Sequence, residues 1–157
     1  MRFRSIKGQA SVEAILVIIF VILFLAVFNN LAQDAERLLK INMIKEQQND
    51  IANSLNSFIK VQEGFVKGFD TDDYFNDFNF SYKIPNLKIP TENFECDINI
   101  TRDRITLRTE IQEDFFVETI RTVNIDNSKI NLINPVLKKC GSEIVCIQTP
   151  ANIINCS

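Results

Sequence analysis

The hydrophobic residues of this chain follow three different patterns along its length. From Ala14 to Phe28 every residue is apolar. From residue 31 to about residue 61, apolar residues recur at spacings of three and four, the period of an amphipathic helix. After Gly64, short runs alternate apolar and polar residues, the period of a β-strand. The patterns predict a long N-terminal helix followed by a β-rich head over residues 64–157.

The helix is predicted to be continuous over residues 9–63, because neither Gly nor Pro occurs there. Residues 12–31 make about 30 Å of helix, the thickness of the hydrocarbon core of a bilayer. We therefore expect residues 12–31 to cross a membrane and residues 32–61 to pack on the head. The apolar residues of the expected packing stripe are Leu31, Ala35, Leu38, Leu39, Ile44, Ile51, Ala52, Leu55, Phe58 and Ile59.

Alternation in the head predicts strands at residues 78–84, 94–100 and 105–111, the last two joined by a hairpin turn at residues 101–103. Shorter candidate strands lie at residues 117–125, 129–133 and 144–148. We expect one antiparallel sheet of four or five strands packed on the second half of the helix, which is an α+β fold. The charged residues expected on its solvent face are Arg102, Arg104, Arg108, Glu110 and Glu118.

Composition excludes several classes of function. The chain has 157 residues, a formal charge of −3 and no His, so the commonest general base and the usual partner of a nucleophile are missing. No phosphate-binding loop, Gly-rich dinucleotide turn or spaced metal cluster occurs, and no basic field suits nucleic acid. Four carboxylates at residues 70–77 lack the spacing of a calcium loop, which favours a solvated acidic loop. We expect a non-catalytic protein without cofactor, metal or nucleic-acid partner.

Three cations, Arg2, Arg4 and Lys7, precede the apolar run. By the positive-inside tendency the N-terminus stays in the cytoplasm and the residues beyond about 32 lie outside. A cleaved secretory signal is disfavoured, because residues 30–32 match its cleavage rule poorly. A plain signal anchor leaves Glu13 unexplained, since a carboxylate at the edge of the apolar run costs a few kcal/mol unless it reaches the headgroups.

The residues around Glu13 resemble a known family. The stretch that leads into the apolar helix is similar to the class III signal peptide of archaeal type IV pilin-like proteins, whose motif is Q-x-S-x-E-x-x-x-L after a short basic leader. Gln9, Ser11 and Glu13 match in register. Val17 stands where the family has Leu, with Leu16 one place earlier, so the departure exchanges one apolar residue for another.

The resemblance implies a processing and assembly pathway. A prepilin-type signal peptidase would cut between Gly8 and Gln9, removing the leader at residues 1–8 and its three cations, so that the formal charge falls from −3 to −6. After leaving the membrane lipid through a pilus assembly platform, copies of the chain would polymerise through their helices. Glu13 would then meet the new amine on Gln9 of a neighbouring subunit, unless cyclisation of Gln9 removes that charge. The expected helix contacts are Ile15, Leu16, Ile19, Ile22 and Leu23.

All four cysteines lie in the part placed outside the cell, where two disulfides are expected. Spacing does not decide the pairing of Cys96, Cys140, Cys146 and Cys156; we favour Cys140 and Cys146 not pairing with each other, and the spacing argues against zinc. The sequons at Asn79 and Asn99 lie at strand positions expected to face water and are candidate glycosylation sites.

The sequence therefore predicts a structural subunit of an archaeal surface filament, made as a membrane precursor and serving adhesion from the cell surface. Two alternatives stay open. The first is a signal-anchored extracellular binding domain that never polymerises. The second is a minor or assembly-priming pilin, which the sequence does not distinguish from a main building block.

Overall fold

A computed structural model describes residues 6–68, 79–89, 92–112, 115–126, 128, 130–132, 135–148 and 153–157, with the side chains of residues 6–11, 66–68, 93 and 112 outside the description. One helix, α1 (Ile6–Gly68), precedes all the strands. The strands are β1 (Asn79–Lys83), β2 (Leu87–Ile89), β3 (Glu92–Phe94), β4 (Cys96–Ile100), β5 (Arg104–Gln112), β6 (Phe115–Thr122), β7 (Ile130–Leu132), β8 (Val136–Lys139), β9 (Glu143–Gln148) and β10 (Ile154–Cys156). The predicted α+β fold is confirmed.

Helix α1 is uninterrupted, as predicted, but it continues through Gly64 to Gly68 instead of ending at residue 63. A Gly in a helix costs about 1 kcal/mol relative to Ala, which neighbouring contacts can offset. Those contacts lie on either side of Gly64. The Glu63 carboxylate accepts a hydrogen bond from the Asp126 amide at 2.8 Å, and the Phe65 ring lies 5.5 Å from the Phe80 ring.

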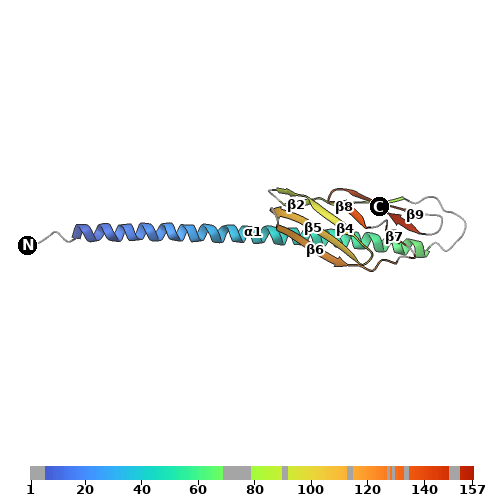
Figure 1. The fold of residues 1–157 in the computed structure, drawn as a ribbon, viewed down its shortest axis with the longest axis horizontal. Helices are drawn as coiled ribbons and strands as arrows, with labels where there is room; N and C mark the ends of the chain where they lie inside the picture. The colour runs from blue at the N-terminus through green and yellow to red at the C-terminus, as the bar shows by residue number, and fades with distance from the viewer. Residues whose placement is uncertain are drawn as a thin grey trace, which may run out of the picture. The chain divides into compact units, whose positions relative to one another are not determined.

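The chain divides into two compact units whose boundary falls inside α1, between Lys40 and Ile41. The first unit, residues 1–40, contains the apolar segment. The second unit, residues 41–157, contains the rest of α1 and all the strands, which gather beside that part of the helix (Figure 1).

The described strands form two four-stranded sheets and one separate hairpin, not the single sheet that the sequence predicted. The first sheet has the order β6-β5-β4-β8 and is antiparallel throughout. The second has the order β1-β9-β10-β7, in which β10 and β7 are parallel. Strands β2 and β3 form the hairpin. The predicted turn at residues 101–103 does join β4 to β5, and Ile98 lies opposite Leu107 across it.

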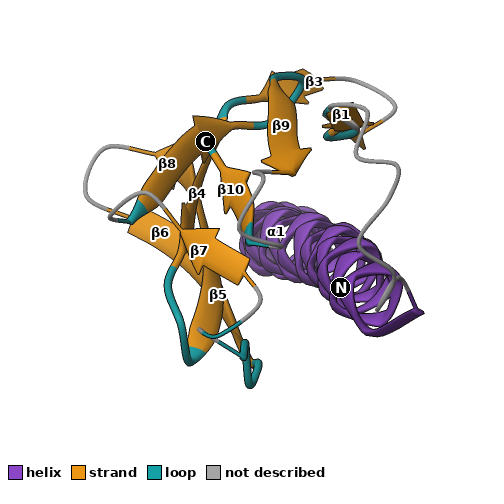
Figure 2. Cartoon of the chain, turned by 90° about the vertical axis from the view of Figure 1, so that its right-hand side faces the viewer, coloured by secondary structure: helices purple, strands orange, loops and turns teal. Residues whose placement is uncertain are grey.

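The main core fills the space between the helix and the sheets. Ile51, Ala52, Leu55 and Ile59 of α1 are buried in one cluster with strand residues of both sheets. Figure 2 shows the strands grouped around one side of the helix. A smaller cluster packs Ile44 against residues of β2 and β6, with its buried members Ile44, Ile89 and Val117. All five residues expected on the solvent face of the sheet are exposed: Arg102, Arg104, Arg108, Glu110 and Glu118.

The expected packing stripe of the helix is only partly buried. It is buried or half-buried from Ile44 to Ile59, whereas Leu31, Ala35, Leu38 and Leu39 are exposed. The spacing of apolar residues is the same in both parts, and within the second unit the strands cover the stripe. Burial along the stripe therefore begins within the second unit, at Ile44.

Two adjacent glutamines attach the helix to separate strands. The fully buried Gln48 donates to the Thr109 hydroxyl at 2.8 Å and to the Val117 carbonyl at 3.2 Å, and accepts from the Thr119 hydroxyl at 2.7 Å. Gln47 accepts from the Lys88 amide at 2.9 Å and donates to the Lys88 carbonyl at 2.5 Å. Gln48 thus holds β5 and β6, and Gln47 holds β2. Periodicity did not predict these contacts, because a polar residue beside an apolar stripe is ordinarily solvated.

Gly141 occupies the turn between β8 and β9, which belong to different sheets. Its φ is +84°, in the left-handed region, and a Cβ atom there would collide with the Asn86 amide. We expect Gly141→Ala to lower the free energy of unfolding by about 2 kcal/mol or more, since the left-handed backbone alone costs about 1–2 kcal/mol for a residue with a Cβ. Urea denaturation of the detergent-solubilised protein measures the change.

Gly64 supplies the matched control for this substitution. It is helical and exposed, and nothing lies within 4 Å of its Cβ position. Gly64→Ala should therefore stabilise the protein by up to about 1 kcal/mol. Adding Asn86→Ala to Gly141→Ala should recover only part of the loss, because the backbone strain persists. Equal effects of the two single Gly substitutions would contradict the role assigned to Gly141.

Candidate functional site

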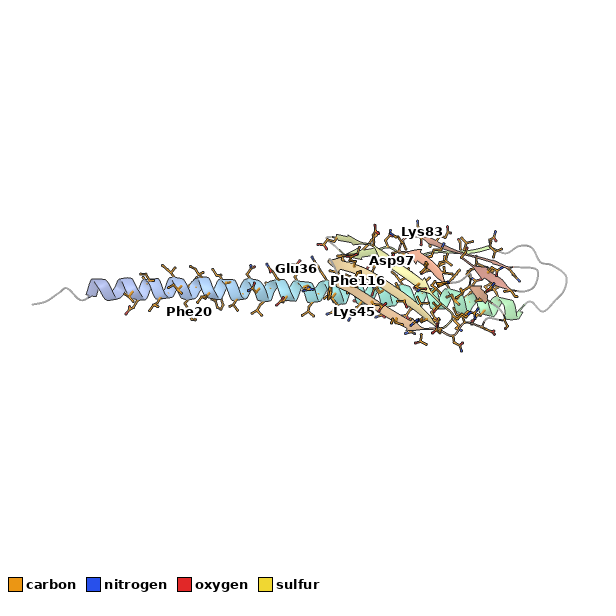
Figure 3. The ribbon with its side chains drawn as sticks, viewed as in Figure 1. Phe20, Glu36, Lys45, Lys83, Asp97 and Phe116 are labelled. Carbon is orange, nitrogen blue, oxygen red and sulfur yellow. A yellow bond between two sulfur atoms is a disulfide. The ribbon has the colours of Figure 1, made fainter. Side chains whose placement is uncertain are left out.

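The largest unusual surface of the described chain is the apolar part of α1. Every large hydrophobic residue from Val12 to Leu31 is 48% to 73% exposed, and Phe20, labelled in Figure 3, is the most exposed. Apolar side chains occupy all sides of the helix over residues 14–28. A contiguous apolar surface of this size requires lipid or protein to cover it. Among the described residues, α1 is the one helix long and apolar enough to cross a membrane.

The five residues predicted for helix contacts lie on one stripe of this surface, since their spacings of one, three and four place them on one helix face. Their exposed fractions range from 48% to 60%. They are Ile15, Leu16, Ile19, Ile22 and Leu23. The single chain does not cover this stripe.

The predicted processing site lies in the first turns of α1. The backbone of Gly8, Gln9 and Ser11 is helical, and their side chains are outside the described part of the structure. Glu13 is described and exposed. Residues 9 and 13 are four apart, so they share a face of the helix. Glu13 is therefore placed where another copy of the helix could approach it.

Beyond the apolar run, charges appear on α1 while apolar residues stay exposed. Lys40 and Glu36 are 3.3 Å apart, a helical pair of modest strength. Leu38 and Leu39 lie between them, exposed by 60% and 63%. Exposed apolar residues of the first unit thus occur beyond the length needed to cross a bilayer, at Leu38 and Leu39.

Both predicted disulfides are present in the head. Cys96 of β4 is bonded to Cys140, and Cys146 of β9 is bonded to Cys156 of β10. Cys140 and Cys146 are not joined, in agreement with the favoured pairing. The bonds join adjacent strands, and no cysteine remains as a zinc ligand. Disulfides of this kind indicate an oxidising compartment outside the cytoplasm.

A cavity of about 590 Å³ lies beside the Cys96–Cys140 bond. Its charged residues are Lys88, Lys139 and Glu95, and the last two form an ion pair at 2.9 Å. The hydrogen bond and charge of Lys139 lower the pKa of the Glu95 carboxyl, and Glu95 raises the pKa of Lys139 for the same reasons. Both groups are exposed, so the pair resembles an ordinary surface ion pair.

The described residues contain no group of three His, Cys, Asp or Glu side chains that could hold a metal. The acidic stretch at residues 70–77 lies outside the described residues.

The two predicted glycosylation sites differ in accessibility. Asn79 is exposed on β1. Asn99 is half-buried between Thr106 and Leu137, and its Oδ1 atom is shielded from solvent without a hydrogen-bond partner. The expectation that both side chains face water freely is met by Asn79 but not by Asn99, because neighbouring strands crowd the latter.

Comparisons of this chain with protein-family models, with curated proteins and with solved structures found no match. Its function is therefore inferred from its own residues and their arrangement.

Proposed function

We propose that this chain is a structural subunit of an archaeal type IV pilus-like surface filament that serves adhesion. A prepilin-type signal peptidase cuts its precursor after Gly8, and copies of the mature chain polymerise through the N-terminal helix. The observation that carries the proposal is the exposed apolar surface of α1 from Val12 to Leu31, with Leu38 and Leu39 also exposed, next to the Gln9, Ser11 and Glu13 motif. The α+β head with its two disulfides is consistent with a pilin-like fold.

The extent of the exposed surface supports assembly as well as membrane insertion. A bilayer core covers about 20 residues of helix. The exposed apolar residues of the first unit span residues 12–39, so a membrane leaves Leu38 and Leu39 uncovered. Copies of the same helix offer matching exposed apolar residues from Val12 to Leu31 and again at Leu38 and Leu39. Helix packing in a filament buries both parts.

Glu13 has a specific role in this proposal. An ionised carboxylate inside a bundle of apolar helices costs several kcal/mol unless a cation pairs with it. Cleavage after Gly8 creates an amine on Gln9, and this amine of one subunit pairs with Glu13 of the next. The pair sets the axial register of the helices. Without cleavage, Glu13 has no such partner within the assembly.

The test combines processing with assembly. We expect the intact mass of the protein from membrane and filament fractions to show that the mature chain begins at Gln9. We expect Glu13→Val to insert into the membrane normally, while the yield of filaments falls at least tenfold. Glu36→Gln is the matched control, because Glu36 is an exposed carboxylate of the same helix outside the motif; its filaments should be normal. Gly8→Phe should block cleavage and retain the leader.

Each readout separates the alternatives. A retained leader in the native protein would contradict the proposal and favour a signal-anchored binding domain. Normal filaments of Glu13→Val would refute the pairing role alone. A mature chain that begins at Gln9 but is rare in isolated filaments would indicate a minor or priming pilin.

A further inference from the structure

The outward side of sheet β6-β5-β4-β8 carries a row of alternating charges. The strand register places Glu118 of β6 opposite Arg108 of β5, Arg108 opposite Asp97 of β4, and Asp97 opposite Lys139 of β8. All four side chains are exposed. Residues directly opposite on neighbouring strands share a face of the sheet, so the four charges form one row with the signs −, +, −, +. Figure 3 labels Asp97 near the middle of this sheet.

The next row on the same side is apolar at both ends. The register aligns Ile120 of β6, Thr106 of β5, Asn99 of β4 and Leu137 of β8. Ile120 is 57% exposed and Leu137 is 69% exposed, whereas the two central residues are half-buried. Phe116, also on this side, lies with its ring 3.7 Å from the Arg108 guanidinium. We call the charged row and the neighbouring row, which runs from Ile120 to Leu137, the outer face.

The order of the charges makes the outer face complementary to itself. Consider a second copy laid face to face, related by a twofold axis that runs parallel to the strands between β4 and β5. The axis places Glu118 against Lys139 of the second copy and Arg108 against its Asp97, so each of these four charges meets its opposite. The same operation places Ile120 against Leu137 of the second copy.

Other arrangements are disfavoured by the same residues. A twofold axis along the charge row, across the strands, would place each of the four residues against its own copy. Four like-charge contacts would result, each of them repulsive. A hydrophobic partner without charges would remove water from the four charges of the row without supplying new counter-charges. The charge order of the outer face therefore favours a second copy of the chain as the partner and a twofold axis parallel to the strands.

We propose that the outer face binds the same face of a second copy of this chain, about a twofold axis parallel to its strands. Facing sheets in such an interface lie about 10 Å apart and keep their strands within about 30° of each other. The contact is isologous, as in most symmetric dimers. It involves the head alone and does not rest on polymerisation through the helix.

Cross-linking of the full-length protein in detergent micelles tests the proposed axis. No described cysteine is free, so an engineered cysteine provides the reactive thiol. The proposed axis brings Ile120 close to Leu137 of the other copy, while two Ile120 residues are about 14 Å apart along the row. A mixture of Ile120→Cys and Leu137→Cys chains should cross-link through a short bismaleimide at least tenfold faster than either variant alone.

Matched variants complete the experiment. Lys83→Cys, exposed on β1 of the other sheet, should not cross-link to Leu137→Cys above background. Adding Arg108→Glu to both mixed chains should reduce cross-linking at least tenfold, and adding Asp97→Arg as well should restore it, because the two positions face each other across the axis. Peptide mapping verifies that both native disulfides persist in each variant.

Two results would overturn the proposal. The first is a mixture that cross-links no faster than the single variants. The second is a glycan on Asn99 in the native protein, since Asn99 lies in the middle of the paired face and a glycan would hold the two copies apart. We expect peptide mapping to show modification at Asn79 only.

Discussion

Removing the Cys96–Cys140 disulfide, by replacing both cysteines with Ala, is expected to lower the free energy of unfolding by about 4 kcal/mol. The bond closes a loop of 44 residues, and a cross-link stabilises mainly by restricting the unfolded chain. The Cys146–Cys156 bond closes a loop of only 10 residues. Its removal should cost about 3 kcal/mol. Denaturation in guanidinium chloride without reductant measures both values.

The difference between the losses caused by removing each of the two disulfides tests this prediction more strictly than either loss alone. Cys96, Cys146 and Cys156 are all nearly fully buried, and Cys140 is half-buried, so both double substitutions leave small cavities in the core. The cavity cost is therefore similar, and the difference of about 1 kcal/mol reflects loop length. A larger loss from the Cys146–Cys156 pair would show that the C-terminal strand depends on its bond for more than chain entropy.

Gln48→Ala is expected to lower the free energy of unfolding by about 3 kcal/mol, because three hydrogen bonds of about 1 kcal/mol each are lost. The substitution also leaves the hydroxyl of the fully buried Thr109 and the Val117 carbonyl without their partner. Urea denaturation followed by circular dichroism provides the measurement.

Gln47→Ala is the control for Gln48→Ala. Gln47 makes two hydrogen bonds to the backbone of Lys88, but both lie in an exposed environment where water can take its place. We expect a loss of at most about 1 kcal/mol. If the two glutamine variants were equally destabilised, the buried position of Gln48 would not be what makes it important.

Several elements could be predicted from the sequence because they depend on neighbours along the chain. Continuity of α1 follows from the absence of Gly and Pro between residues 9 and 63. The β4–β5 hairpin follows from two alternating runs around a short turn. The exposed charges of the sheet follow from the same alternation, since residues i and i+2 of a strand share a face.

Other features depended on strands that are distant in the sequence. Strands β2, β3, β8 and β10 were not predicted; each has three or four residues, over which a period of two is a weak signal, although the equally short β7 lies within the predicted strand at residues 129–133. The disulfide partners followed from strand order, which brings Cys96 beside the end of β8 and Cys156 opposite Cys146. The second sheet includes a parallel pair, β10 with β7, whose strands are separated by more than twenty residues.

The apolar positions of the helix show most clearly which features the sequence determines and which depend on the tertiary structure. The sequence by itself determined that residues 12–31 form an apolar helix and that an amphipathic stripe follows, because helix formation and periodicity are local properties. Only the tertiary structure decided that the stripe is covered from Ile44 onward and exposed at Leu31, Leu38 and Leu39. It likewise decided that Gln48 is buried and that Gly141 has a left-handed backbone beside Asn86. Burial of a residue depends on which residues, distant in the sequence, pack against it in the folded chain. The local pattern of a helix or turn carries no information about these residues.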